Sequence, residues 1–223
     1  MTRRARADMD ALRPIRVERA DDAYPSSLAR FLGADAPERV FVFGSVELLN
    51  RQMLALFCSI KCPGNVILKT YDLAKALGDA SIPVIGGFHT PMERECLDLL
   101  LRGTQPVIIC PARGLERMRL SPAVTGAIQA GRGLLVSPFE PRHRRATADL
   151  AARRNRFVAA LATSVFVSHA APGGKTEALC REIISVPKPL FTVDCAENAN
   201  LLALGARPLV VEELSVLRDG PAG

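Results

Sequence analysis

The stretch Val165-Phe166-Val167-Ser168-His169-Ala170-Ala171-Pro172-Gly173-Gly174-Lys175-Thr176-Glu177 decides the fold class. Its first three residues are apolar and mostly β-branched, which predicts a buried strand. The glycine-containing turn that follows leads into Lys175–Ile184, whose apolar spacing predicts a helix. A buried strand, a glycine turn and a helix in this order are typical of open α/β sheets, in which helices connect parallel strands.

The same alternation extends over most of the chain. The apolar runs expected to be strands are Val40–Phe43, Leu54–Cys58, Ile82–Ile85, Val107–Cys110, Leu134–Val136, Val165–Val167, Leu190–Val193 and Leu209–Val211. The helices expected between them are Val66–Leu77, Pro91–Leu101, Ala146–Leu161, Lys175–Ile184 and Asn198–Leu204. Because unbroken apolar runs suit strands covered on both faces, we predict a Rossmann-like, doubly wound α/β fold with a mostly parallel sheet. In this prediction residues 1–20 form a mobile basic arm, and residues 21–223 form a single domain.

The composition narrows the class of protein. The chain has 223 residues, and 48% of them are hydrophobic, which excludes a disordered protein. An aromatic content of 5% with no Trp argues against an aromatic stacking platform for nucleic acid. No apolar run reaches the about 18 residues of a membrane helix, so we expect no membrane contact. The six cysteines form no C-x-x-C pair and no zinc-type cluster, so we expect a cytoplasmic protein with buried thiols, no metal and no cofactor.

The net charge of +6 is concentrated in two segments. Residues 1–19 carry six arginines against three acidic residues, and residues 142–156 carry six against one. The second segment places Arg153, Arg154, Asn155 and Arg156 on a predicted helix. Arginine suits bidentate phosphate contacts, so these four residues are predicted to bind a ligand. A solvated basic helix face in an arginine-rich chain is the alternative.

Three turns at predicted strand ends have the composition of anion-binding turns, and ligands of doubly wound sheets bind at this edge. Their candidate binding residues are Ser59 and Lys61, then Gly86, Gly87, His89 and Thr90, and finally Gly173, Gly174, Lys175 and Thr176. Thr90, Pro91 and Glu93 also have the spacing of a capping box, which makes Glu93 a cap rather than a catalyst. An ordinary strand-to-helix turn is the alternative at each place. With the arginines, the turns predict a pocket for a nucleotide or a strand of nucleic acid.

The order of these segments resembles the DprA/Smf DNA-processing proteins. In that family a glycine-rich turn, an R-N-R-I-I-A-G-L helix, an S-G-x-x-x-T-A turn and a G-T-N-x-L-I-x-x-G-A segment follow one another. Here Arg154–Leu161 matches the helix, and Asn200–Ala206 matches the last segment. Tyr24–Leu28 is similar to the Y-P-x-x-L that precedes the family's domain, so the resemblance covers residues 22–210.

The resemblance implies a protein that binds single-stranded DNA, forms a homodimer and loads a RecA-type recombinase during natural transformation. It implies phosphate contacts for Arg154 and Arg156, a cation at Lys61 near the family's G-S/T-R turn, and a place for Asn200 in the ligand site. Two family turns differ here, because G-S-R reads Cys58-Ser59-Ile60-Lys61 and G-I-D-x-x-A-H reads Pro91–Cys96. These departures keep a nucleotide open as the alternative ligand.

A second resemblance is to LOG-type phosphoribohydrolases, which carry P-G-G-x-G-T-x-x-E after a strand. Pro172–Glu177 is a shortened version that lacks one glycine. In that alternative Glu177 or Glu182 is the catalytic carboxylate for cleaving the N-glycosidic bond of a nucleoside monophosphate. A nucleotide-sensing or regulatory protein without catalysis is a third interpretation. The rest of the chain fits the DNA-processing family better, so we favour a role without catalysis.

Overall fold

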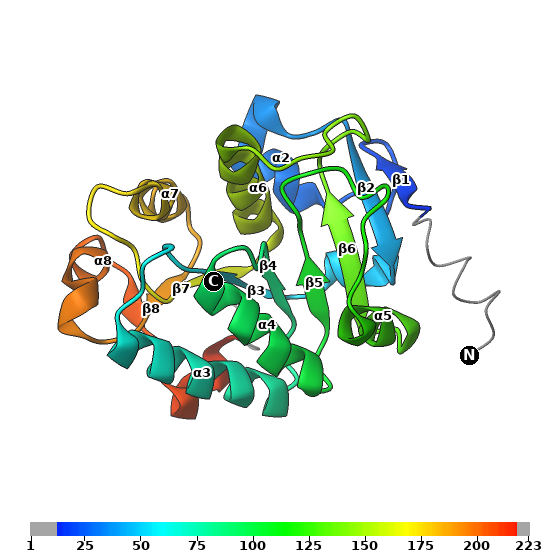
Figure 1. Ribbon diagram of the computed structural model, residues 1–223. Coiled ribbons are helices and arrows are strands. Elements are labelled where there is room, and N and C mark those ends of the chain that lie inside the picture. Colours follow the sequence, from blue (N-terminus) through cyan, green and yellow to red (C-terminus); the bar gives the residue numbers. More distant parts are fainter. Residues whose placement is uncertain (1–12, 218–223) are drawn as a thin grey trace.

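The computed structural model describes residues 13–217, in which one nine-stranded sheet lies between two layers of helices (Figure 1). The strands are β1 (Ile15–Glu18), β2 (Arg39–Gly44), β3 (Leu54–Phe57), β4 (Val84–Gly86), β5 (Val107–Ile109), β6 (Gly133–Ser137), β7 (Ser164–Val167), β8 (Leu190–Thr192) and β9 (Arg207–Pro208). The helices are α2 (Ser26–Leu32), α3 (Gly64–Asp79), α4 (Pro91–Arg102), α5 (Pro122–Gln129), α6 (Ala148–Leu161), α7 (Lys175–Ile184) and α8 (Ala199–Ala203). Short 3-10 helices are η1 (Gly33–Asp35), η2 (Val46–Asn50), η3 (Ala196–Asn198) and η4 (Val211–Leu217).

The sheet has the order β1-β2-β6-β5-β4-β3-β7-β8-β9, and every pair from β6 to β9 is parallel. Two pairs at one edge of the sheet are antiparallel, namely β1 with β2 and β2 with β6. Every residue of β3 and β7 is buried, as expected for central strands with helices on both faces. The predicted Rossmann-like α/β fold is confirmed.

Two clusters of buried apolar side chains separate the sheet from its helix layers. One cluster joins the sheet to α2, α6 and α7, which lie above it in Figure 1. The other joins the sheet to α3, α4, α5 and η4 on the opposite face. Within residues 13–217, no helix combines the length and the apolar character needed to cross a bilayer.

Two ends of the chain differ from the sequence prediction. The predicted arm ran to residue 20, but Ile15–Glu18 forms β1, whose only buried side chain is that of Val17. One buried position is too weak a pattern to identify a strand, and residues 1–12 of the arm lie outside the described part. The predicted strand Leu209–Val211 is wrong, because β9 ends at Pro208 and the chain then turns into η4. There Leu214 and Leu217 are buried in the cluster that contains α3.

The order of the strands places a crevice beside β3 and β7. The chain runs from β3 through β4 and β5 to β6 in one direction, and continues from β7 to β8 in the other. Such a switch point is where open α/β sheets bind ligands. The two loops that leave it are joined, because the Ser59 N–H donates to the His169 carbonyl at 2.9 Å and the Ala171 N–H donates to Ser59 Oγ at 3.1 Å.

A buried arginine joins α6 to the sheet beside this crevice. Arg154 is only 4% exposed, and its Nη1 donates to the carbonyl oxygen of Cys110, just after β5, at 3.0 Å. Its guanidinium fills the space beside Gly87, where a Cβ would lie 1.6 Å from Nη1. No carboxylate oxygen of the described residues lies within 4.0 Å of this cation. One side chain therefore fixes α6 against the ends of β4 and β5.

We expect Gly87→Ala to lower the free energy of unfolding by about 2 kcal/mol, because the new Cβ displaces a buried guanidinium from its hydrogen bond. In an Arg154→Ala background the same change should cost only about 0.5 kcal/mol, since the space is then vacant. Urea unfolding of the single and double variants measures both values. Gly126→Ala is the control, because open space surrounds its Cβ position. If Gly87→Ala lowered the free energy of unfolding equally in both backgrounds, the guanidinium of Arg154 would not be the group that occupies the space beside Gly87.

Candidate nucleic-acid interface

A cleft of about 640 Å³ lies at this edge of the sheet, between α6 and α7. Its volume is within the usual range of small-molecule and nucleotide sites. Alanines dominate the lining, so we call it the alanine cleft. Its lining residues are Ile60, His89, Ala112, Ala146, Thr147, Ala148, Ala151, Ala152, Asn155, Arg156, Lys175, Ala178, Leu179 and Glu182.

The α6 wall of the cleft follows from the start of that helix. Thr147 is its N-cap, and the threonine hydroxyl accepts the Leu150 N–H at 3.2 Å. Helix spacing then turns Ala148, Ala151 and Asn155 toward the same side. The Nε of buried Arg154 donates to Asn155 Oδ1 at 2.7 Å, which fixes the amide of Asn155 at the cleft wall.

An ion-pair network closes the far end of the α6 wall. Arg156 Nε donates to Glu182 of α7 at 2.8 Å, and its Nη1 donates to Asp35 of η1 at 2.9 Å. The hydrogen bond to Asp35, followed by that to Glu182, raises the pKa of Arg156. The guanidinium of Arg156 is thus already neutralised by two carboxylates.

The loop between β7 and α7 is held by its own polar residues. Glu177 accepts the Gly173 N–H at 3.0 Å, the Asn200 amide at 2.6 Å and Arg181 Nη2 at 3.3 Å. The bond from Asn200, and then that from Gly173, lower the pKa of Glu177. Both carboxylate oxygens accept hydrogen bonds, and these bonds hold the loop. Gly173 has a φ of +70°, a conformation that favours glycine, and Gly174 is the N-cap of α7.

Asn198 is fully buried and makes hydrogen bonds behind this loop. Its amide donates to the Ser168 carbonyl at 2.7 Å and to Thr192 Oγ1 at 2.9 Å, and its Oδ1 lies 2.9 Å from His169 Nδ1. These contacts join the ends of β7 and β8 behind the cleft. Asn200, which the sequence placed in the ligand site, donates to Ala170 and Glu177 and so supports the loop.

The polar groups of the turn after β4 make hydrogen bonds to other groups of this chain. Thr90 and Glu93 form the predicted capping box, with Pro91 at the first helical position, so the role of Glu93 as a cap is confirmed. The Glu93 carboxylate also accepts the His89 N–H at 2.8 Å and the Cys58 N–H at 2.9 Å, which ties the ends of β3 and β4. A Cβ at Gly86 would lie 3.0 Å from the ring of Phe88, and a Cβ at Gly87 would meet the guanidinium of Arg154. The space that the two glycines leave open is therefore occupied by side chains of this chain.

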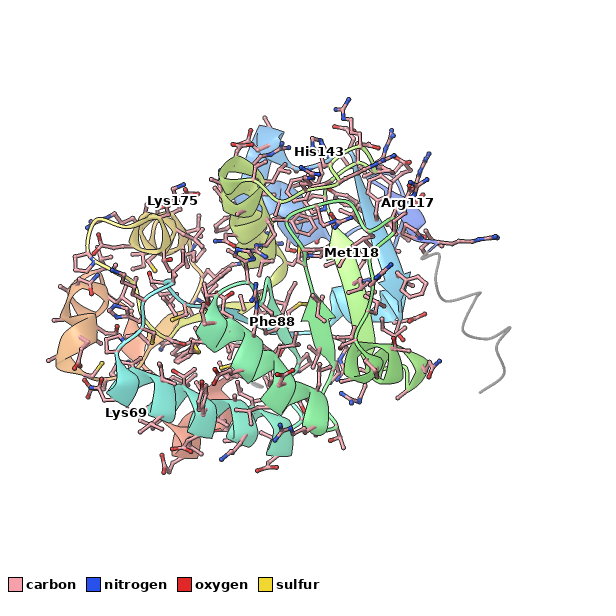
Figure 2. The ribbon with its side chains drawn as sticks, in the orientation of Figure 1. Lys69, Phe88, Arg117, Met118, His143 and Lys175 are labelled. Carbon is pink, nitrogen blue, oxygen red and sulfur yellow. The ribbon has the colours of Figure 1, made fainter. Side chains whose placement is uncertain are left out.

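A group of arginines lies on the loops after β5 and β6 and on α6, and it reaches the cleft where Ala112, Ala146 and Ala152 contribute to the lining. We call it the basic rim, and it comprises Arg113, Arg117 and Arg119 from the loop after β5, Arg142, Arg144 and Arg145 from the loop after β6, and Arg153 from α6. Figure 2 shows Arg117 and His143 of these two loops on the same side of the molecule. The loops are joined by a hydrogen bond of 2.9 Å from the Gly114 N–H to the His143 carbonyl. Arg153 stacks on Phe139 at 5.6 Å. None of the rim arginines makes an ion pair with a residue of the described chain.

The structure brings together some of the predicted site residues and separates others. His89, Asn155, Arg156, Lys175 and Glu182 line the cleft. Lys61 is exposed on the turn next to Ile60, and Arg153 lies on the rim. The other predicted residues outside the cleft lining are Ser59, Gly86, Gly87, Thr90, Arg154, Gly173, Gly174, Thr176, Glu177 and Asn200. Across residues 13–217, no three His, Cys, Asp or Glu side chains gather in a way that could hold a metal ion.

Sequence reasoning missed the apolar lining of the cleft and three of the seven rim arginines. Alanines at helical spacing in 146–152, facing Ala178 and Leu179 of α7, were the available signal for the cleft. They were overlooked because alanine carries no chemistry of its own. Arg113, Arg117 and Arg119 are scattered in sequence, and only the contact between two loops brings them beside Arg142–Arg145.

The hydrogen bonds to Glu177 predict a pH dependence. Because its pKa is lowered from 4.5 in the folded protein, its contribution to stability is present above about pH 4.5 and is lost as the pH falls through the lower native value. We expect the Glu177→Gln variant to be less stable than the unchanged protein at neutral pH. Below about pH 4.5 its stability should fall less steeply with pH, because it lacks this carboxylate. Thermal unfolding as a function of pH tests this, with exposed Glu47→Gln as the control. If the unfolding temperature of Glu177→Gln fell with acid pH as steeply as that of the unchanged protein, the prediction would be contradicted.

Comparison with known proteins identifies the family. The family model for DNA recombination-mediator protein A matches residues 16–217, nearly the whole chain. No curated protein matches the sequence. The DNA processing protein A (DprA) of Streptococcus pneumoniae has a similar structure, with a TM-score of 0.78 and 18% identity over 100% of this chain and 80% of that one.

Two further solved structures are similar. DNA processing protein A of Helicobacter pylori, described by its single-stranded DNA binding mode, has a TM-score of 0.72 and 19% identity over 94% of this chain and 98% of that one. The molybdenum cofactor binding protein of Rippkaea orientalis has a TM-score of 0.52 and 11% identity over 76% of this chain and 96% of that one. At these identities the likenesses show the fold, whereas the match to the family model covers the sequence itself. The chain belongs to the DNA recombination-mediator protein A family.

Proposed function

We propose that this protein binds single-stranded DNA, with the phosphates on the basic rim and the strand passing over the alanine cleft. The observation that carries the proposal is the basic rim itself. Its arginines have no acidic partner among the described residues, although the chain neutralises others, such as Arg156, with two carboxylates. Unpaired arginines on one surface favour a polyanion, because each can pair with a phosphate and release its counterions.

The ends of the cleft extend this surface. Lys175 lies at one side of the cleft and is exposed at the start of α7, as Figure 2 shows. Lys61 is exposed next to Ile60, which lines the cleft. A strand that runs from the rim across the cleft toward Lys175 meets cations on both sides.

The burial of Arg154 changes which arginines we propose as phosphate contacts. Arg154 is buried, so in this proposal it positions Asn155 and α6, and the exposed arginines of the rim contact phosphates. Arg156 reaches a phosphate only by giving up Asp35 or Glu182. Asn155 and His89 then face the strand from the cleft walls.

The family supports DNA over the alternatives. Family membership and the single-stranded DNA binding mode of the Helicobacter pylori protein both favour a DNA ligand. The hydrolase alternative is not favoured, because Glu177 is committed to the loop after β7 and Glu182 to Arg156. We further infer, from the family resemblance, a homodimer that passes DNA to a RecA-type recombinase in the cytoplasm.

We expect Arg144→Ala/Arg145→Ala to weaken binding of a single-stranded oligonucleotide about tenfold at low salt, and to lower the slope of log affinity against log salt by about 1.4, because two phosphate contacts are lost. Fluorescence anisotropy of a labelled thymidine oligonucleotide over a salt series measures both quantities. The matched control is Arg51→Ala/Lys75→Ala, which removes two exposed cations, one just before β3 and one on α3. Equal affinity and equal slope in the two double variants would refute the rim as the DNA surface.

A further inference from the structure

We propose that Cys58 and Cys62 form a redox-active thiol pair, which a hydroperoxide converts to a disulfide across the turn after β3. In this pair Cys62 is the thiol that reacts with the peroxide, and Cys58 is the thiol that resolves the product. The chemistry is separate from DNA binding, because its product is a covalent bond within the chain.

The turn after β3 brings the two sulfur atoms together. Cys58 directly follows β3, and Cys62 directly precedes Pro63, the N-cap of α3. Residues 59–61 separate them, and the two thiols are hydrogen-bonded to each other. Both side chains pack in the apolar cluster that joins the sheet to α3. The pair therefore has the proximity that disulfide formation requires.

The two thiols differ in exposure as a reacting and a resolving thiol must. Cys58 is 4% exposed, and its backbone is held because its N–H donates to the Glu93 carboxylate at 2.9 Å. Cys62 is only partly buried. A small oxidant can therefore reach Cys62 from solvent, whereas the apolar cluster screens Cys58 from it.

The electrostatics also select Cys62 as the reacting thiol. The hydrogen bond donated by Cys58 lowers the pKa of Cys62, and the same bond, followed by burial, raises the pKa of Cys58. Cys62 also lies at the positive end of the sixteen-residue helix α3, which favours a thiolate. Burial raises the pKa of each of the other four cysteines, all of which lie in the described part of the chain: Cys96, Cys110, Cys180 and Cys195. Because the thiolate is the nucleophile, Cys62 is expected to react first.

The oxidation takes two steps, written here for hydrogen peroxide. The Cys62 thiolate attacks one oxygen, so an S–O bond forms, the O–O bond breaks and the leaving hydroxide takes up a proton as water. The Cys58 sulfur then attacks the Cys62 sulfenic acid, so an S–S bond forms, the S–O bond breaks and the hydroxyl leaves with the Cys58 proton as water. The two thiols lose two electrons, and one peroxide is reduced to two waters. The product closes a ring around residues 59–61, which include Ile60 of the cleft lining.

The test maps the bond in the full chain after treatment of the reduced protein with one equivalent of hydrogen peroxide. Iodoacetamide blocks the remaining thiols before digestion with trypsin. Trypsin cleaves after Lys61, so Cys58 lies in the peptide Gln52–Lys61 and Cys62 lies in Cys62–Lys69. A disulfide between the two cysteines therefore appears in the mass spectrum as these two peptides joined.

Three variants separate the roles of the thiols. Cys62→Ser removes the reacting thiol, and Cys58→Ala removes the resolving thiol while leaving a small apolar side chain at the buried position. Cys195→Ser is the matched control, because Cys195 is also partly exposed. We expect the joined peptides from the unchanged protein and from Cys195→Ser. Cys62→Ser should keep its Cys58 thiol, and Cys58→Ala should retain a sulfenic acid on Cys62 that dimedone labels.

Alkylation rates provide a second readout that needs no oxidant. At neutral pH we expect iodoacetamide to modify Cys62 of the unchanged protein about fivefold faster than Cys195, because more of Cys62 is thiolate. Equal rates would overturn the assignment of Cys62 as the reacting thiol. The absence of joined peptides from the oxidised unchanged protein would overturn the pair. An equal loss of the Cys58 thiol in Cys62→Ser and in the unchanged protein would overturn it as well.

Discussion

The buried position of Arg154 is the constraint on which the carboxyl edge of the sheet depends. A guanidinium buried to 4% exposure must find hydrogen-bond partners, because desolvating a charge is costly. It finds the Cys110 carbonyl after β5 and the oxygen of Asn155, and it occupies the space beside Gly87 after β4. The position of α6, the absence of a side chain at residue 87 and the direction of the Asn155 amide follow from this one placement. The α6 wall of the cleft therefore has a defined geometry before any ligand arrives.

The remaining polar groups at this edge divide into two sets. Glu93, Glu177 and Asn198 bind backbone groups of the loops after β3, β4 and β7, and so hold the crevice in shape. The arginines of the basic rim bind no carboxylate among the residues described here, and all of them except the half-buried Arg113 are exposed. A rigid internal network beside an unpaired basic surface is a suitable arrangement for a nonspecific DNA ligand, because the phosphates find preorganised cations. The apolar cleft lies between these two sets of residues.

Much of the fold could be predicted because its central strands consist almost entirely of apolar residues. Leu54–Phe57 and Val165–Val167 are apolar and buried at every position, so their composition alone identifies them. The strand expected at Ile82–Ile85 begins two residues later, after Pro83, which has no N–H to give to a ladder. Edge elements were harder, since β1 buries only Val17, and helices α2 and α5 are short. The crevice at this edge of the sheet follows from the predicted fold, but the sequence did not separate the buried arginine Arg154 from the exposed Arg153, because burial depends on residues distant in sequence.

The sequence by itself determined the α/β class, the parallel order of strands and helices, the capping box at Thr90 and the concentration of arginine near α6. These are local properties, and a short window of residues carries each of them. Only the tertiary structure decided that Arg154 is buried while Arg153 is exposed, that the glycines after β4 make room for a side chain, and that two separate loops form one basic rim. The physical reason is that burial and charge pairing are set by residues distant in sequence. Arg156, for example, is neutralised by Asp35, which lies 121 positions away.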